Sequence, residues 1–178
     1  MSWLRRDGAR KEAEALYAAI VSQARRPEFY AELGVPDTLD GRFELVALHT
    51  FLVLRRLKAR GQAGEAGQEL VDLFIQDMDA SLRELGAGDL GVGRRVKAMA
   101  QALYGRISAY EMGLAGSAEA LEAALRRNLF RTAPETGPQP GTLKAVAEYV
   151  RGESLGAGAL FGPPPSAPGA ASAREQGR

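Results

Sequence analysis

Two aspartates, Asp77 and Asp79, stand two residues apart in a stretch of helical periodicity, a spacing that resembles metal- and phosphate-binding motifs. On a helix, residues two apart point to different faces, so the two carboxylates cannot easily share one ion. Asp79 lies on the polar face and is spaced to pair with Arg83 four residues later. Asp77 lies at the edge of the apolar face, where we expect it to bond a neighbouring helix or a basic side chain. Structural roles are therefore favoured, and no metal is expected.

His49 is the one histidine of the chain, which has no cysteine. The lack of cysteine excludes disulfide scaffolds, thiolate nucleophiles and zinc fingers. Because His49 lies in the most apolar stretch, we expect a core or boundary histidine whose ring bonds a carbonyl or a carboxylate. A catalytic histidine needs a partner acid, base or nucleophile, and the only polar cluster to inspect is Asp77, Asp89 and His49. We therefore expect no catalytic residue and no cofactor.

The glycines of residues 86–91 match the G-x-G-x-x-G fingerprint of dinucleotide-binding proteins. A helical rather than a strand-like stretch precedes them, which argues against that site. An anion site is the alternative, in which backbone N–H groups with Arg94, Arg95 and Lys97 would hold a phosphate or carboxylate. The simpler interpretation is a helix–helix turn in which Asp89 caps the next helix.

The apolar residues recur with helical spacing throughout, and no strand alternation or internal repeat is evident. About six helices are predicted, over residues 12–26, 41–60, 65–85, 94–112, 117–130 and 140–151, with a short helical turn after Pro27. The helix over 41–60 is apolar nearly all round, which is typical of a helix at the centre of a bundle. Arg55, Arg56, Lys58 and Arg60 are expected to mark where it leaves the core. The fold class is therefore all-α.

A length of 178 residues favours a single domain. We expect a flexible N-terminus over residues 1–11 and the helical domain over residues 12–151. Glycine, alanine, proline and serine dominate residues 152–178, which predicts a mobile tail. Leu155, Leu160 and Phe161 are the tail residues able to dock on the body.

Charge and hydropathy exclude further classes of protein. The net charge is +1, but residues 61–92 hold one basic and seven acidic side chains between two basic blocks. The interleaved aromatics of an RNA-binding face are missing, so no nucleic-acid specificity is expected. No secretory signal is visible, and the longest near-apolar run, residues 45–54, is shorter than the about 20 residues that a spanning helix needs. These features predict a cytoplasmic protein.

Two stretches occur in an order and at spacings that resemble one family. The first is RPEFYAELGVPDTLDGRF at residues 26–43, continuing to LH at 48–49. The second is FIQDMDASLRELGAGDL at residues 74–90, continuing through VKAM at 96–99 to YGR at 104–106 and Tyr110. Together they resemble the ubiquinol–cytochrome c chaperone family of mitochondria and α-proteobacteria over residues 14–130. Ala87, Gln101 and the stretch after residue 132 depart from the family pattern.

The resemblance implies a non-catalytic assembly factor. Family members bind newly made cytochrome b, a membrane protein, and shield it until it enters the cytochrome bc complex (respiratory complex III). The mitochondrial members also work with a small partner protein, and this dimer contacts the ribosome. The Ala- and Gly-rich composition favours a bacterial member of the α-proteobacterial type, cytoplasmic and at most peripheral at the inner membrane.

A chaperone for a membrane protein needs an exposed apolar surface. Either the helix over 43–57 or the wide apolar face over 70–85 could supply it, unless both simply fill the core. We expect partner-binding residues on the second of these helices and on the turn and helix that follow: Asp72, Phe74, Asp77, Met78, Asp79, Arg83, Asp89, Leu90, Arg94, Arg95, Lys97, Tyr104 and Arg106.

The charge blocks add a hypothesis about the client. Cytoplasmic loops of membrane proteins are rich in Lys and Arg, so the acidic block over 61–92 could bind those loops. The basic blocks would then face anionic headgroups. The alternative is an α-helical adaptor that binds a different, soluble protein or an anionic membrane surface.

Overall fold

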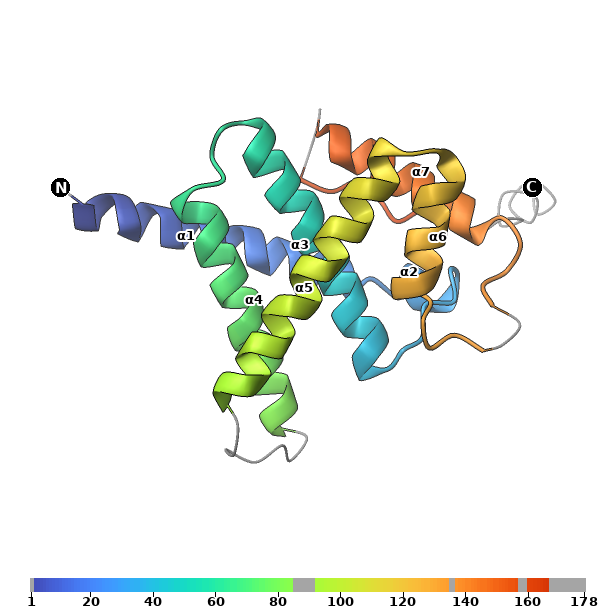
Figure 1. The fold of residues 1–178 in the computed structure, drawn as a ribbon, viewed down its shortest axis with the longest axis horizontal. Helices are drawn as coiled ribbons and strands as arrows, with labels where there is room; N and C mark the ends of the chain where they lie inside the picture. The colour runs from blue at the N-terminus through green and yellow to red at the C-terminus, as the bar shows by residue number, and fades with distance from the viewer. Residues whose placement is uncertain (1, 85–91, 135–136, 157–159, 167–178) are drawn as a thin grey trace, which may run out of the picture.

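The computed structural model describes residues 2–84, 92–134, 137–156 and 160–166, and the regular structure within these ranges is entirely helical. The helices are α1 (Ser2–Ala24), α2 (Pro27–Ala31), α3 (Leu39–Ala59), α4 (Glu65–Glu84), α5 (Val92–Ala115), α6 (Ala118–Asn128) and α7 (Thr142–Leu155). Figure 1 shows α3 and α5 crossing near the centre, with α4 towards one end and α6 and α7 towards the other. The all-α prediction is confirmed, and the short turn expected after Pro27 is α2.

The helix starts follow local capping chemistry. The Thr38 hydroxyl accepts a hydrogen bond from the Gly41 N–H at 3.1 Å and caps α3. The Ser117 hydroxyl caps α6 in the same way, through the Ala120 N–H at 3.3 Å. Each side-chain oxygen satisfies one of the N–H groups that a first helical turn leaves without a partner. Cap-forming residue types at these positions are visible in the sequence, with Asp37 or Thr38 available before α3 and Ser117 before α6, and the structure selects Thr38 and Ser117.

α1 begins at Ser2 rather than at Glu12, where apolar periodicity placed its start. The additional turns carry ion pairs between residues four apart, Lys11 with Asp7 at 3.3 Å and Arg10 with Glu14 at 3.0 Å. Such pairs support a helix without burying an apolar face. The first turns of α1 therefore project beyond the bundle (Figure 1).

α3 is the central helix, as predicted, and packs against α1, α4, α5 and α7. Its fully buried side chains include Leu45, Leu48 and Leu52. One expectation was wrong: Arg56 does not mark the exit from the core, because only 7% of its surface is exposed. It remains inside because it is bonded to Glu153 of α7, with an Nη2–Oε2 distance of 2.7 Å.

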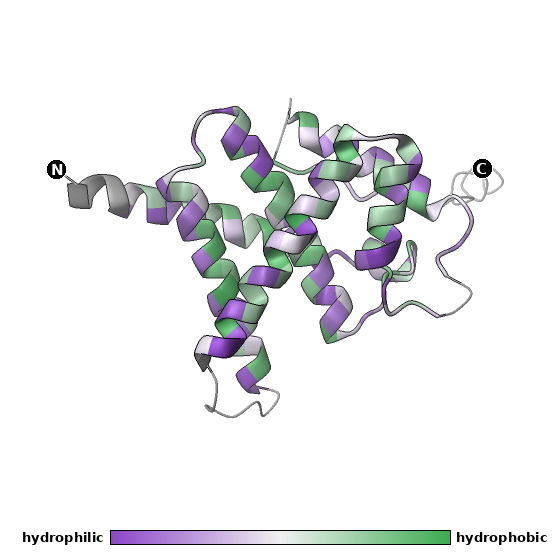
Figure 2. Ribbon diagram, viewed as in Figure 1, coloured by the Kyte–Doolittle hydropathy of each residue, from purple (hydrophilic) through white to green (hydrophobic). Residues whose placement is uncertain are grey.

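Among the described helices, none combines the length and the hydropathy that a membrane-spanning segment needs. Figure 2 shows hydrophilic and hydrophobic residues interspersed along these helices instead of one continuous apolar stretch.

The C-terminal segment divides into two parts. Leu160 and Phe161 pack against the core, as expected of them, whereas Leu155 is 82% exposed and does not dock. α7 also continues to Leu155, past the expected end of the helical domain at residue 151. The rest of the expected mobile tail, residues 157–159 and 167–178, lies outside the described residues.

His49 is fully buried and bonded to a carbonyl, as expected of a core histidine. Its Nδ1 lies 2.8 Å from the Leu45 carbonyl oxygen, and its Nε2 lies 2.9 Å from the Tyr149 hydroxyl. Because a carbonyl only accepts, Nδ1 carries the hydrogen, and the neutral Nε2 accepts from Tyr149. Burial lowers the pKa of His49 to about 4, so the ring stays neutral in the folded protein at neutral pH.

This buried ring predicts a specific loss of stability in acid. The unfolded chain binds a proton on His49 below pH 6.5, whereas the folded protein does so only near pH 4. Stability is therefore lost as the pH falls through this window, by about 3 kcal/mol in the free energy of unfolding. Urea unfolding should show the difference between the wild type and His49→Gln changing by that amount between pH 6.5 and 4. A constant difference would contradict a buried neutral ring.

Candidate binding groove

A groove of about 800 Å³ lies among α1, α2, α3 and α4, and its lining includes two of the predicted site residues. The chain forms it because α1 ends at Ala24 and Pro27 starts α2 in a new direction. Gly34, at φ +69°, then turns the chain towards α3. The C-terminal half of α4 forms the remaining wall. The apolar side chains of the lining are Val21, Ala24, Pro27, Tyr30, Leu39, Phe43, Val46 and Met78.

Phe43 joins the groove to the core. Its ring centroid lies 5.6 Å from that of Phe74, which is fully buried, and the guanidinium carbon of Arg106 lies 5.3 Å from the Phe43 centroid. The cation over the ring face and the aromatic neighbour fix Phe43 from two sides. Leu39, nearby on α3, remains 43% exposed. The groove therefore has an apolar surface that the core does not cover.

Charged groups surround this apolar surface. Asp77 of α4 accepts a hydrogen bond of 2.7 Å from the Tyr17 hydroxyl of α1, which confirms the expected bond to a neighbouring helix. Burial, with the Asp77 carboxylate adding to it, raises the pKa of Tyr17 above its usual value. Glu84 lies further along the same wall, whereas Arg25 and Arg42 line the opposite side. An apolar floor with a polar rim suits the binding of an apolar chain segment.

A buried ion pair lies behind Phe43. The Nε of Arg106 on α5 lies 3.1–3.2 Å from both carboxylate oxygens of Glu44, whose side chain is fully buried. Burial raises the pKa of Glu44, and the Arg106 guanidinium offsets part of that rise. Arg106 was expected to bind a partner, but its guanidinium instead pairs Glu44 and covers Phe43.

Of the thirteen expected partner-binding residues, the structure brings Asp77 and Met78 together in the groove. Phe74 is fully buried and therefore cannot reach a partner in this conformation. Asp72 is bonded to Gln68, with an Nε2–Oδ1 distance of 3.1 Å.

Asp79 contributes little to an acidic surface, because it is bound by two arginines. Its carboxylate lies 2.7 Å from the Nε of Arg83, the expected pair, and 3.4 Å from the Nε of Arg95. The Arg83 guanidinium, with Arg95 adding to it, holds the pKa of Asp79 below its usual value. These contacts link α4 to α5.

Three more of the expected residues lie outside the groove. Arg94 and Lys97 are exposed near the start of α5, and Tyr104 further along that helix is 52% exposed. Asp89 and Leu90 lie outside the described residues.

The groove residues of α1 and α2 are not among the site residues predicted from the sequence. Tyr30 is the one that a sequence signal could have revealed, because it directly follows Phe29 on a five-residue helix. Adjacent residues of a helix point in different directions, so a helix that packs on the core with one face is expected to bury only one of these rings. Phe29 is fully buried, and Tyr30 lines the groove while its hydroxyl donates to the Ala24 carbonyl at 2.8 Å.

The described part of the chain offers no metal centre, since no three His, Asp or Glu side chains gather there as ligands would. The polar cluster proposed for catalysis also does not form among described residues. His49 is bonded to Leu45 and Tyr149, whereas Asp77 is bonded to Tyr17. The arrangement supports binding rather than acid–base chemistry.

Comparisons with known proteins agree on one family. Residues 31–160, from the end of α2 through α7, match the family model described as Ubiquinol-cytochrome C chaperone. Ubiquinol-cytochrome-c reductase complex assembly factor 1 of Xenopus laevis is 28% identical over 137 residues, which are 76% of this chain and 67% of that protein. Its counterparts of Mus musculus and Homo sapiens are 27% identical over 76% of this chain, which spans only 45% of their length.

A solved structure resembles the chain in fold and in sequence. The crystal structure of the Cbp3 homolog from Brucella abortus superimposes with a TM-score of 0.70 at 42% identity. The match covers 84% of this chain and 82% of that one.

The ion pair behind Phe43 generates a stability prediction. Arg106→Leu leaves the Glu44 carboxylate buried without its partner and should lower the free energy of unfolding by about 3–5 kcal/mol. Arg94→Leu, an exposed change on the same helix, should cost about 0.5 kcal/mol or less. The double variant Glu44→Leu/Arg106→Leu should recover much of the loss, because no charge remains buried. Urea unfolding measures all three, and equal losses for Arg106→Leu and Arg94→Leu would contradict the pairing.

Proposed function

This chain belongs to the ubiquinol–cytochrome c chaperone family, and we propose that it binds newly made cytochrome b and supports assembly of the cytochrome bc complex. The related animal proteins carry the name of assembly factors for the ubiquinol–cytochrome c reductase complex. An assembly factor requires a binding surface and no reacting groups. We therefore propose that this chain is a non-catalytic chaperone that acts in the cytoplasm at the inner membrane.

The observation that carries the proposal is the apolar groove beside α4. A membrane protein exposes apolar segments until it is inserted and assembled, and a chaperone must cover them. Met78 and Phe43 offer half-buried apolar surface there, and Leu39 adds an exposed one. Methionine adapts its shape to varied apolar partners, which suits a chain that is not yet folded. We assign this groove to the client.

The charges of the α4 wall support a client with basic loops. Lys and Arg accumulate on the cytoplasmic side of membrane-spanning segments. Asp77 and Glu84 are the acidic residues of α4 that line the groove. Asp79 is outside the lining, and its charge is already paired with Arg83 and Arg95. We therefore assign the electrostatic contact with client loops to Asp77 and Glu84.

The exposed face of α5 supplies a second surface in this proposal. Arg94, Lys97 and Tyr104 lie there, outside the groove. We assign to it the contacts that the family resemblance implies in addition to the client: a small partner protein, the ribosome and the anionic membrane surface. A basic face with one exposed aromatic ring is compatible with acidic partners of these kinds.

A deletion strain tests the family-level role. Loss of the chain should deplete the cytochrome bc complex while other respiratory enzymes keep their normal amounts. An unchanged cytochrome bc complex would contradict the proposal and favour an adaptor for a different protein.

A matched pair of methionine variants tests whether the groove binds the client. Met78→Lys places a charge in the apolar contact, and co-purification of cytochrome b should fall by about tenfold or more. Met112→Lys is the control, because Met112 is 72% exposed and does not line the groove. Both variants should retain wild-type helicity by circular dichroism. Equal recovery of cytochrome b with the two variants would exclude the groove as the client site.

A further inference from the structure

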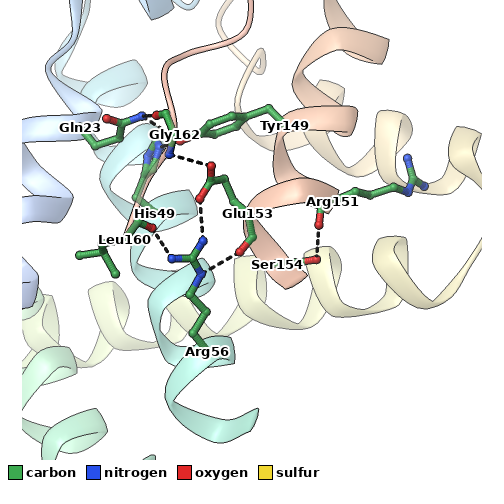
Figure 3. Close-up of polar contacts among 9 residues, drawn as sticks. All are labelled: Gln23, His49, Arg56, Tyr149, Arg151, Glu153, Ser154, Leu160 and Gly162. Atoms are coloured by element: carbon green, nitrogen blue, oxygen red, sulfur yellow. Dashed lines mark hydrogen bonds and ion pairs between the residues drawn. The ribbon is translucent and has the colours of Figure 1, made fainter. Parts of the chain in front are cut away.

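Residues 160–166, Leu-Phe-Gly-Pro-Pro-Pro-Ser, form a strap that has no regular secondary structure and lies against α1, α3 and α7. Figure 3 shows the strap beside side chains from these three helices. The family match ends at residue 160, so almost all of the strap lies beyond the part of the chain that defines the family.

Three side chains bind the backbone of the strap. Arg56 of α3 donates to the Leu160 carbonyl, and a carboxylate oxygen of Glu153 accepts from the Gly162 N–H at 2.8 Å. Gln23 of α1 donates to the Gly162 carbonyl, also at 2.8 Å. Each of three helices thus contributes a group that recognises the main chain (Figure 3). Main-chain hydrogen bonds of this kind are how proteins hold extended peptides.

Phe161, the second residue of the strap, packs against the ring of His49. The Phe161 ring stands edge-on to the His49 ring, with 5.1 Å between the centroids and an interplanar angle of 87°. Phe29 and Tyr149 lie on other sides of His49, at 5.3 and 5.9 Å. Edge-to-face contacts of this geometry stabilise aromatic pairs beyond the area they bury.

Gln23, His49, Arg56 and Glu153, which contact the strap, form a slot together with Tyr149, which bonds Gln23 and His49. A Cβ atom at position 162 would lie 2.9 Å from a carboxylate oxygen of Glu153, so a side chain there would require that carboxylate to shift away from Arg56. Glycine therefore fits this position of the slot best, and the proline that follows it has no N–H group in need of a partner.

The residues of the slot are also bonded to one another. Arg56 is bonded to Glu153 at the carboxylate, 2.7 Å, and at the carbonyl, 2.8 Å. The hydroxyl of Tyr149 accepts from Gln23 and donates to His49, both at 2.9 Å. None of these bonds involves residues 160–166. Release of the strap therefore leaves the buried charge of Arg56 paired and avoids the penalty of an isolated buried ion.

We propose that this slot is a peptide-binding site for an extended Phe-Gly-Pro segment, and that the strap is its resident, displaceable ligand. The strap binds at the high effective concentration of a covalently linked segment, on the order of mM. A peptide segment of another molecule can bind in the slot only when the strap is released. The slot is thus a third binding surface, separate from the groove and from the exposed face of α5.

Fluorescence anisotropy with the labelled peptide Leu-Phe-Gly-Pro-Pro-Pro-Ser tests the proposal on the full chain. The strap-release variant Phe161→Ala/Gly162→Ala should bind this peptide at least about tenfold more tightly than the wild type, whose slot is filled. Adding Gln23→Ala should weaken that binding, because the donor to the glycine carbonyl is lost. Ser166→Ala, at an exposed strap position, should bind the peptide no better than the wild type.

A release variant that keeps wild-type helicity and does not bind the peptide would overturn the proposal. Hydrogen exchange in the wild type provides a second measurement that does not depend on any variant. The Gly162 amide should exchange at least about 100-fold faster than the buried amides of α3, because the strap opens before the protein unfolds globally. Exchange of Gly162 only at the rate of global unfolding would make the strap part of the core and would equally overturn the proposal.

Discussion

A buried stretch of helix must find a partner for each titratable side chain that it carries into the core, and α3 carries three. Glu44 is paired with Arg106 of α5, His49 with Tyr149 of α7, and Arg56 with Glu153 at the end of α7. An unpaired charge in such a position would cost several kcal/mol, so these contacts fix the rotation and register of α3 against its neighbours. Apolar packing alone tolerates small shifts of a helix, whereas these three bonds do not.

The groove follows from this arrangement. Glu44 holds Arg106 in place, Arg106 covers Phe43, and Phe43 rests on Phe74 in the core. The apolar wall of α3 is therefore rigid although it faces solvent. α4 adds Met78 on the facing wall, while the Tyr17–Asp77 bond ties α4 to α1. A preformed apolar surface of this kind does not require ordering on binding, which favours capture of a flexible client.

The sequence predicts features that depend on neighbours along the chain and misses those that depend on distant ones. The pair Asp79–Arg83 and the caps Thr38 and Ser117 lie within four residues of their partners. The pair was predicted correctly, and the sequence limits the cap of α3 to Asp37 or Thr38 and offers Ser117 for α6. The burial of Arg56 was not predicted, because its partner, Glu153, lies 97 residues away in the sequence.

The groove shows the same limit. Asp77 was rightly expected to bond another helix, but the identity of Tyr17, 60 residues away, was not accessible. Helical periodicity places Val21 and Ala24 on the apolar face of the helix predicted over 12–26, but it gives only the face and not what covers it, so it cannot show that both residues line a groove.

The groove and the slot both depend on α2, a helix whose position is fixed by packing against its neighbours. A five-residue helix is unstable alone, and the side chain of its N-cap residue, Arg26, makes no capping bond. Phe29 anchors the helix by packing against His49 and Tyr149 on the strap side, and Tyr30 faces the groove from the next position. The wall of the groove is therefore set by the aromatic cluster that Phe161 covers. Phe29 and Tyr30, adjacent on one short helix, therefore tie the groove wall to the rings that the strap contacts.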